Sequence, residues 1–356
     1  MVNKKQRLFL VSNMYPSPEK VRYGIFVKNF EEAVADFFQV EKVVLTKKYS
    51  FLSKFLGYLK LYFQIVQLYF ICKKNDLVYV HFPLHLAPAL LPLWWLNRKI
   101  VLNFHGSDLV FNSTLKKALS LFLIPGLKKS NIVLPSDYYK EKLLAEFSVS
   151  PSKLYVYPSG GINSNVFSPN RKGENSSFVI GFVSNFIEGK GWRIFFDALR
   201  RIKEEKSIAN FEILMVGDGP DKPEIEDLLA ALDIKFEIIS NISQKELAVI
   251  YNQMDVFVFP TYREEESLGL VGLEAMACGV PVIASKTGGP MGYVEENVNG
   301  FLFDKKDVKM LTEKMLAFYA LTKEQKNTMK HNAITTAQAY DSVNVNKNLV
   351  AFLESL

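Results

Sequence analysis

Short apolar segments alternate with longer stretches of helical periodicity along the first half of the chain. Five of these segments are rich in Val, Ile and Leu, and they span residues 7–12, 41–46, 76–82, 99–106 and 131–136. Continuous apolar runs of this length, separated by helices, are typical of strands that are buried on both faces of a parallel sheet. We therefore predict an α/β fold with a doubly wound parallel sheet in this half.

The same alternation starts again in the second half. Its apolar segments span residues 177–185, 210–219, 235–240, 255–260 and 280–285. A polar stretch at 168–177 is the predicted linker, so we predict two Rossmann-like domains, over residues 1–172 and 173–339. A C-terminal helix at about 340–356 is expected to pack back on the first domain. Because open α/β sheets bind ligands at the carboxyl ends of their strands, we expect the substrate in a cleft between facing domains.

Composition supports two domains and adds an asymmetry of charge. The chain has 356 residues, of which 49% are hydrophobic, which is enough for two cores. Residues 1–175 hold 24 Lys and Arg against 11 Asp and Glu, a balance of +13, and the remainder holds 19 against 26, a balance of −7, which together give the net +6. The basic half favours an anionic partner, such as a membrane surface, a phosphorylated substrate or a nucleic acid.

Several features predict a cytoplasmic protein. Cys72 and Cys278 are too few for a disulfide framework, which favours a reducing compartment. The apolar run from Leu8 to Val11 is shorter than the core of a signal peptide, which takes about 7–15 residues. The apolar segment 84–96 falls short of the roughly 20 residues that span a bilayer. We expect neither an export signal nor a transmembrane helix.

The segment from Arg263 to Ser285 follows a predicted strand. It contains a loop, a predicted helix that ends at Gly279, and the next predicted strand. Gly269, Leu270 and Val271 would form the helix N-terminus, where unpaired amides and the helix dipole suit a phosphate.

Two carboxylates flank this helix N-terminus, Glu266 before it and Glu274 inside the helix. An ionised carboxylate can accept two hydroxyl donors, as the vicinal diol of a ribose or sugar offers. Phosphate-binding amides between two such groups fit a nucleotide-sugar. The alternative is that Glu266 is one of three acidic loop residues, Glu264 to Glu266, and only a solvated charge at a helix start.

The stretch from Glu266 to Glu274, ESLGLVGLE, followed by AMACGVPVIAS and a glycine pair at 288–289, resembles the EX7E motif of retaining glycosyltransferases of family 4. Further blocks resemble that family in its order: HGSDL (105–109), PSGGINSNVFSP (158–169), GFVSNFIEGKG (181–191), LMVGDGP (214–220) and VNGFLF (298–303). The resemblance covers most of the chain. It implies the GT-B fold, with an N-terminal acceptor-binding domain and a C-terminal domain that binds the nucleotide-sugar.

The resemblance also implies residue roles on the donor side. Glu274 would hold the ribose hydroxyls and Glu266 the hydroxyls of the transferred sugar, as a catalytic residue. Lys190 would be a second catalytic residue, a cation at the diphosphate leaving group. The remaining donor-binding positions are Gly24, Asn185, Ile242, Gly269, Leu270 and Val271. Without the surrounding blocks, a lone lysine at a helix start such as Lys190 would be interpreted as solvent-exposed.

In the N-terminal half the resemblance makes His105 a catalytic residue near the donor sugar, although a lone histidine at a strand end is often a structural hydrogen-bonding residue. Gly24 would let the backbone approach the diphosphate, with Tyr23 where the family has a second glycine. His81 and His85, which follow the third strand, are candidates to face the acceptor.

The chain departs from the family pattern at one donor-binding position. The family usually has an arginine five or six residues before the lysine, and Ser184 and Asn185 stand there instead. Asn185 donates hydrogen bonds but supplies no charge. Arg193 and Arg263 are the candidate substitutes.

The implied reaction is a retaining transfer without a metal, since no Asp-x-Asp motif is present, and without a cofactor, since the nucleotide-sugar is a substrate. We favour a UDP-sugar, then a GDP-sugar, and a glycan or lipid-linked acceptor of capsule, lipopolysaccharide or glycolipid synthesis. Residues 51–75 combine aromatic residues, Leu and Lys. They fit either an anionic membrane surface, which would make the protein peripheral on the inner face of the cell membrane, or a buried crossover helix.

Other classes fit less well. A dinucleotide-dependent oxidoreductase would need GxGxxG after the first strand, where SNMYPSP stands, and a P-loop NTPase would need GxxxxGK[ST]. No nucleic acid partner is expected. The alternatives that remain are another GT-B enzyme, such as a nucleotide-sugar 2-epimerase or a glycan phosphorylase, and a non-catalytic scaffold that binds glycans or membranes.

Overall fold

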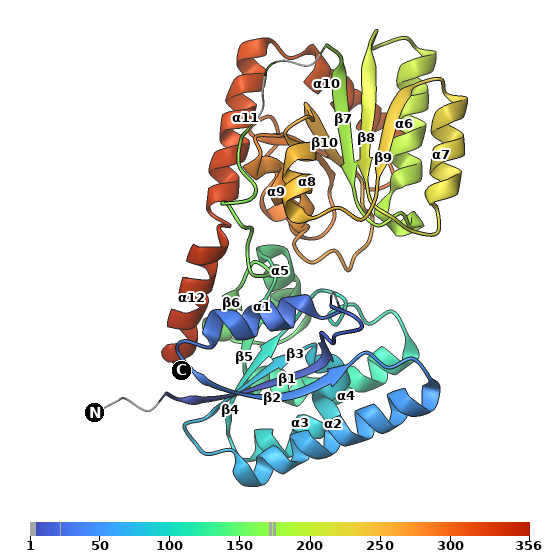
Figure 1. Ribbon diagram of the computed structural model, residues 1–356. Helices are drawn as coiled ribbons and strands as arrows, with labels where there is room; N and C mark the ends of the chain where they lie inside the picture. Colours follow the sequence, from blue (N-terminus) through green and yellow to red (C-terminus); the bar gives the residue numbers. More distant parts are fainter. Residues whose placement is uncertain (1–4, 22, 171–172, 174–175) are drawn as a thin grey trace. The chain divides into compact units, whose positions relative to one another are not determined.

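The computed structural model describes residues 5–21, 23–170, 173 and 176–356. Close contacts divide the chain into two compact units (Figure 1). Unit 1 runs to Gly160 and also takes in Val345–Leu356, and unit 2 is Gly161–Asn344. Each unit holds a six-stranded sheet in which the strands are parallel, so the predicted α/β fold with two Rossmann-like domains is confirmed.

Unit 1 contains the five strands that its apolar runs predict, and one more. In the spatial order β2-β1-β3-β4-β5-β6, the strands are β2 (Gln39–Thr46), β1 (Arg7–Tyr15), β3 (Leu77–His81), β4 (Lys99–Asn103), β5 (Asn131–Leu134) and β6 (Leu154–Val156). The unpredicted β6 is three residues long and only half-buried. A short strand at the edge of a sheet leaves no apolar run in the sequence.

Helices cover both faces of this sheet. They are α1 (Ile25–Val34), α2 (Phe51–Ile71), α3 (Ala87–Trp95), α4 (Thr114–Lys129), α5 (Asp137–Glu146) and α12 (Ser342–Glu354), with short 3-10 turns at η1 (Pro83–Leu86) and η2 (Pro151–Lys153). Side chains of α2 to α5 share one core cluster with the sheet, and those of α1 and α12 share the other. In α12, Leu349 and Leu353 are fully buried in that second cluster. The predicted return of the C-terminal helix to the N-terminal domain is confirmed.

Unit 2 has the same architecture. In the order β12-β11-β10-β7-β8-β9, its strands are β12 (Gly300–Phe303), β11 (Val282–Ser285), β10 (Val256–Phe259), β7 (Phe178–Val183), β8 (Phe211–Val216) and β9 (Lys235–Ile239). Its helices are α6 (Trp192–Glu204), α7 (Lys222–Ala231), α8 (Gln244–Tyr251), α9 (Leu270–Ala277), α10 (Val308–Ala320) and α11 (Lys323–Gln338), with 3-10 turns at η3 (Glu188–Lys190) and η4 (Gly289–Gly292). The helices pack into two core clusters with the sheet.

Contacts divide the two units at Gly160, earlier than the predicted boundary at residue 172. Ile162 and Phe167 are buried in a core cluster of unit 2, and the Ile162 N–H donates to the carbonyl of Tyr340 at 2.8 Å. Packing therefore attaches residues 161–170 to unit 2, although the sequence analysis assigned them to the first domain. Residues 171, 172, 174 and 175 of the predicted linker lie outside the described residues.

Within the described residues, no helix is both long enough and apolar enough to pass through a membrane.

Candidate functional site

The predicted helix after β10 is present as α9, and its first residue follows a glycine in the left-handed region. Gly269 has φ 76° and ψ 54°, a conformation that glycine adopts without the steric cost of a Cβ. A Cβ at this position would lie 2.6 Å from the ring of Phe259. Leu270 and Val271 are half-buried at the start of α9, where backbone amides lack intrahelical partners. The loop therefore delivers free N–H groups to the carboxyl edge of the sheet.

Lys190 and Glu266, both predicted catalytic residues, contact each other. Lys190 Nζ donates to Glu266 Oε2 at 2.6 Å, and the two side chains are only 17% and 12% exposed. Thr261 Oγ1 lies 3.3 Å from the same carboxylate oxygen. Lys190 follows β7 and Glu266 follows β10, which are neighbouring parallel strands. The interpretation of either residue as a solvated charge is therefore wrong.

Glu274 lies in the second turn of α9. Tyr251, a fully buried residue at the end of α8, lies with its hydroxyl 3.3 Å from Glu274 Oε2. Burial raises the pKa of the Glu274 carboxyl to about 7, and the hydrogen bond from Tyr251 opposes this shift. Sequence reasoning missed Tyr251, which gives no motif signal. A carboxylate in this setting has a strong demand for hydroxyl donors, since its ionised form is poorly solvated.

The two candidate substitute cations differ in their surroundings. Arg193 is bound by both oxygens of Glu224, at 2.5 and 2.7 Å, and its guanidinium lies 4.2 Å from the centre of the Trp192 ring. The side chain of Arg263 packs instead over Gly189, in the turn that carries Lys190. Of the two, Arg263 is the one that contacts the turn carrying Lys190, and both arginines have acidic partners.

The other donor-side positions are peripheral to this contact. Asn185 is exposed just after β7, and its carbonyl accepts from the N–H of Ile187 at 3.0 Å. Ile242 is half-buried against the core cluster that contains α9. The acidic residues beside Glu266 have ion-pair partners: Glu264 lies 3.4 Å from Lys305 Nζ, and Glu265 lies 3.9 Å from Arg263 Nε.

In unit 1, His81 and His105 form a pair. His81 ends β3 in register with Asn103 at the end of β4, and His105 follows two residues later. His81 Nδ1 lies 2.9 Å from His105 Nε2 and 3.3 Å from Asn103 Nδ2. The two imidazoles share a hydrogen bond in which either ring can be the donor, depending on their tautomers.

Aromatic rings enclose this pair. The ring centres of Phe26 in α1 and of Phe82 lie 4.7 and 4.4 Å from that of His105. Burial lowers the pKa of His105 to about 3 and holds the pKa of His81 well below its usual value. Both rings are therefore neutral at neutral pH, so that His105 offers hydrogen bonds and not a positive charge.

The remaining two predicted residues of unit 1 are held by the protein itself. The His85 carbonyl, on η1, accepts a hydrogen bond from the Tyr62 hydroxyl of α2. Gly24 precedes α1 with φ 73°, and a Cβ there would lie 2.8 Å from the Met14 carbonyl carbon. The close backbone approach at Gly24 is thus to the end of β1, which requires glycine whether or not a ligand binds.

Asp108 is a further buried group of this site, and sequence reasoning gave it no role. Its Oδ1 accepts the backbone N–H of His105 at 2.9 Å, and its Oδ2 has no hydrogen-bond partner among the described residues. Burial raises the pKa of the Asp108 carboxyl to about 7. The Asp108 carboxyl therefore holds the backbone of His105 in place. Its burial lowers the stability of the folded chain when the carboxyl is ionised.

We expect Asp108→Asn to stabilise the chain above neutral pH, by a few kcal/mol at most. The folded-state pKa lies above the ordinary value of 3.8, so the folded state binds more protons than the unfolded state between these values. This group should make wild-type stability fall as pH rises from about 4 to 7, and the variant, which keeps an oxygen for the His105 N–H, should show a shallower slope. Urea unfolding at several pH values measures the stability of both proteins. Equal slopes of stability against pH in the wild type and the variant would contradict a raised pKa for Asp108.

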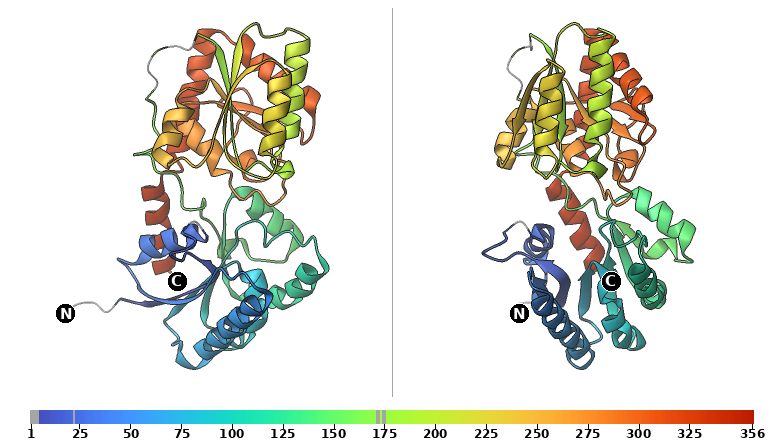
Figure 2. Two further views of the ribbon diagram at one scale, coloured as in Figure 1. Left: turned by 45° about the vertical axis from the view of Figure 1, so that its right-hand side comes forward. Right: turned by 90° about the vertical axis from the view of Figure 1, so that its right-hand side faces the viewer.

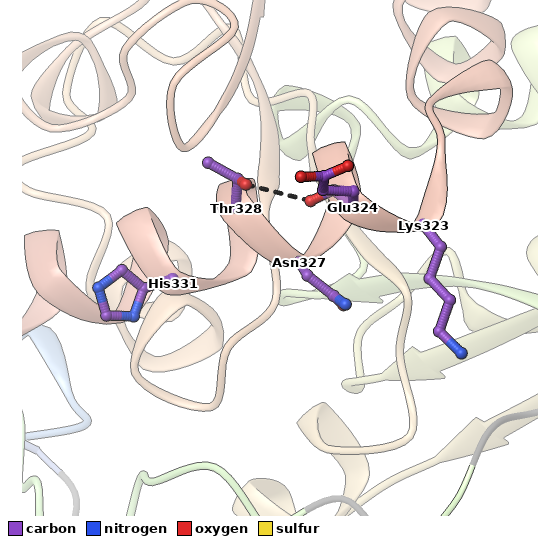
Figure 3. Close-up of a pocket in the computed structure, with 5 residues that line it drawn as sticks. All are labelled: Lys323, Glu324, Asn327, Thr328 and His331. Atoms are coloured by element: carbon purple, nitrogen blue, oxygen red, sulfur yellow. Dashed lines mark hydrogen bonds between the residues drawn. The ribbon is translucent and has the colours of Figure 1, made fainter.

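A surface pocket of about 610 Å³ lies on α11, apart from the predicted residues (Figure 3). Five exposed side chains of this one helix line it: Lys323, Glu324, Asn327, Thr328 and His331. The Thr328 hydroxyl donates to the Glu324 carbonyl at 3.1 Å, within the helix. The pocket adds no group to the candidate site.

Two family models match the chain. "Glycosyltransferase Family 4" matches residues 19–160, and "Glycosyl transferases group 1" matches residues 166–336. The chain belongs to the family 4 glycosyltransferases. The two matched ranges correspond to the two units, so each half of this glycosyltransferase carries its own part of the family pattern.

Individual relatives are distant. An uncharacterized glycosyltransferase of Methanocaldococcus jannaschii is 27% identical over 218 residues, which cover 61% of this chain and 57% of the relative. A capsular polysaccharide biosynthesis glycosyltransferase of Staphylococcus aureus is 28% identical over 200 residues, which cover 52% of this chain and 51% of the relative. The matched segments thus span about half the length of these relatives.

Solved structures show the fold. Sucrose-phosphate synthase from Thermosynechococcus elongatus matches with a TM-score of 0.76 at 19% identity, over 99% of both chains. HepE from Anabaena, in complex with UDP, matches with a TM-score of 0.73 at 20% identity, over 99% of this chain and 100% of that one. The fold is the GT-B fold of these glycosyltransferases, as predicted.

Proposed function

We propose that this glycosyltransferase moves a sugar from a nucleotide-sugar, a UDP-sugar before a GDP-sugar, to a glycan or lipid-linked acceptor, and that it retains the anomeric configuration. One observation carries the proposal: the buried contact between Lys190 and Glu266, at the sheet edge where α9 begins. The name of the Staphylococcus aureus relative, which concerns capsular polysaccharide, and the UDP in the HepE structure support this choice of acceptor and donor class.

The residues of unit 2 suit the parts of such a donor. The free amides of Leu270 and Val271 and the ammonium of Lys190 complement a diphosphate. Lys190 has three donors and Glu266 takes one of them, which leaves others for phosphate oxygens. Glu266, beside the ammonium, accepts the hydroxyls of the transferred sugar, and the carboxylate of Glu274 accepts the ribose diol. The role of His105 at the transferred sugar stays a prediction.

The same proposal covers the course of the reaction. Lys190 stabilises the charge that builds on the leaving diphosphate, and the leaving phosphate helps to remove the acceptor's proton. Transfer then needs neither a metal ion nor a cofactor. A cytoplasmic location, with the acceptor presented at the inner face of the cell membrane, completes the proposal.

A screen of nucleotide-sugars tests the donor class. UDP-, GDP- and ADP-sugars are each added to the protein, and thermal stabilisation and release of the nucleoside diphosphate are measured. We expect one donor to raise the Tm and to be hydrolysed slowly in the absence of an acceptor. Product analysis distinguishes a 2-epimerase, which would convert the sugar. The absence of any response to all three classes would refute the donor assignment.

A further inference from the structure

Helix α2 has two apolar faces, and only one of them is buried. Leu61, Ile65 and Leu68 pack into the core of unit 1. A second set of side chains, 38% to 79% exposed, follows the helix at spacings of four and three: Leu52, Leu56, Leu59, Phe63, Val66 and Phe70. At about 100° per residue these six lie within roughly 80° around the helix axis. They form one continuous exposed stripe, called the α2 stripe below.

Neighbouring helices on the same face of the sheet carry further exposed apolar residues. Trp95, at the end of α3, is 72% exposed, and Leu115 and Leu121 of α4 are 63% and 69% exposed. Helices α2, α3 and α4 share one core cluster and lie side by side in unit 1 (Figure 2). Single exposed apolar residues are ordinary in soluble proteins. The six residues of the α2 stripe are contiguous along one helix, and a set of this size indicates an interaction surface.

The charge around the stripe decides which partner fits it. Residues 42–75 contain no Asp or Glu. They contain exposed lysines at both ends of α2 and within it: Lys47, Lys48, Lys54, Lys60, Lys73 and Lys74. Residues 109–136, which include α4, likewise contain four lysines and no acidic residue. The apolar surface is therefore flanked by charge of a single sign.

This charge disfavours a second copy of the chain and favours anionic lipid. Two α2 helices packed stripe to stripe, in either direction, would bring lysines together with no carboxylate to pair them. A bilayer with anionic headgroups accepts the apolar side chains below the interface and the ammonium groups at the level of the phosphates. Charge complementarity thus selects the membrane surface.

We propose that the α2 stripe is a docking surface for an anionic membrane, with α2 lying in the plane of the interface and its lysines on the headgroups. The evidence for this docking surface is the exposed face of α2. Its purpose, access to a lipid-linked acceptor, rests on the proposed function. This proposal selects the membrane-surface interpretation of residues 51–75 over that of a wholly buried crossover helix, because the structure buries only one face of α2.

Flotation with lipid vesicles tests the docking surface without any donor or acceptor. Vesicles are made of phosphatidylcholine alone or with phosphatidylglycerol. We expect the wild type to float with the anionic vesicles, more weakly at high salt, and little with the neutral ones. The double variant Leu59→Glu/Phe63→Glu should lower the bound fraction at least about tenfold, because two charges would enter the interface. Both positions are exposed, so the fold should survive.

Two further variants sharpen the result. Val249→Glu changes an exposed apolar residue of α8 in unit 2 and should float like the wild type. Lys60→Glu/Lys74→Glu, which changes one lysine beside the stripe and one at its C-terminal end, should remove the preference for anionic vesicles. Equal flotation of the wild type and the stripe variant would overturn the proposal, as would a dimer in solution that the stripe variant converts to a monomer without any change in flotation. Failure of the nucleotide-sugar screen would leave the flotation result unaffected.

Discussion

Replacement of Lys190 by methionine is expected to lower the kcat of sugar transfer by roughly 10²- to 10³-fold, the usual effect of losing one donor at a site of developing charge. Lys190 Nζ lies 2.6 Å from Glu266 Oε2 beside the N-terminus of α9, where we place the leaving diphosphate. Methionine keeps much of the apolar stem and removes the charge. Steady-state kinetics with the donor identified by the screen measures kcat and KM, and circular dichroism checks the fold.

A structural effect must be separated from this chemical one. Loss of Lys190 leaves Glu266 without its cation in a mostly buried setting, which costs stability. The double variant Lys190→Met/Glu266→Gln removes both charges and should recover stability but not turnover. Lys305→Met is the matched control, since Lys305 pairs with Glu264 on the exposed surface. This variant should keep the wild-type kcat. If Lys190→Met turned over at the wild-type rate, the charge at this position would have no catalytic role.

The sequence predicted those parts of the fold that rest on local patterns. Strands such as β3 and β10 are fully buried on both faces, so hydrophobic side chains occupy every position except that of His81 and produce visible runs. Strand β6 is half-buried and three residues long, and no comparable run marks it. The segment around Ile162 was assigned to the wrong side of the boundary, because its burial depends on contacts with residues near Tyr340, far along the chain.

The candidate site shows the same limit more sharply. Glu266, Gly269 and Glu274 lie within one short segment, so spacing alone suggested their relation to a helix N-terminus. The contact between Lys190 and Glu266 joins residues 76 positions apart and follows from the adjacency of β7 and β10, which no local pattern encodes.

In unit 1 the sequence assigned His81 and His105 to different ligands, whereas strand register brings His81 Nδ1 to 2.9 Å from His105 Nε2. A ligand that reaches one of them therefore lies close to the other. Polar partners such as Asp108 and Tyr251 were missed because a single buried polar residue leaves no periodic signal.

Glu274→Gln is expected to weaken donor binding by about 10- to 100-fold, which corresponds to the loss of a hydrogen bond to a charged group. Glutamine preserves the shape of the side chain and its contact with Tyr251, but it has one acceptor oxygen and an amide that donates, so it cannot accept both hydroxyls of a ribose. Calorimetric titration with the nucleoside diphosphate measures the Kd. An unchanged Kd in a folded variant would show that Glu274 does not hold the ribose.

The pH dependence of donor binding provides the stricter test, because burial raises the pKa of the Glu274 carboxyl to about 7. Only the ionised form accepts two hydroxyls, so wild-type affinity should fall as pH is lowered below 7, by up to about tenfold per unit. Stability without ligand should change in the opposite sense. The folded-state pKa exceeds the ordinary value of 4.5, so this group's contribution to the free energy of unfolding decreases as pH rises from about 4.5 to 7.

Two variants distinguish this titration from others in the protein. Glu274→Gln should abolish the pH dependence of affinity and make the fall in stability shallower, because only the contribution of Asp108 then remains in this pH range. Tyr251→Phe removes the hydrogen bond that favours the ionised form and should shift the fall in affinity to higher pH while the maximal affinity stays close to the wild-type value. A shift to lower pH would mean that the Tyr251 hydroxyl favours the protonated carboxyl. That result would contradict its assignment as a hydrogen-bond donor to the Glu274 carboxylate. With the expected shift to higher pH, Tyr251 acts on binding of the nucleotide through the charge of Glu274, although the Tyr251 side chain is itself buried.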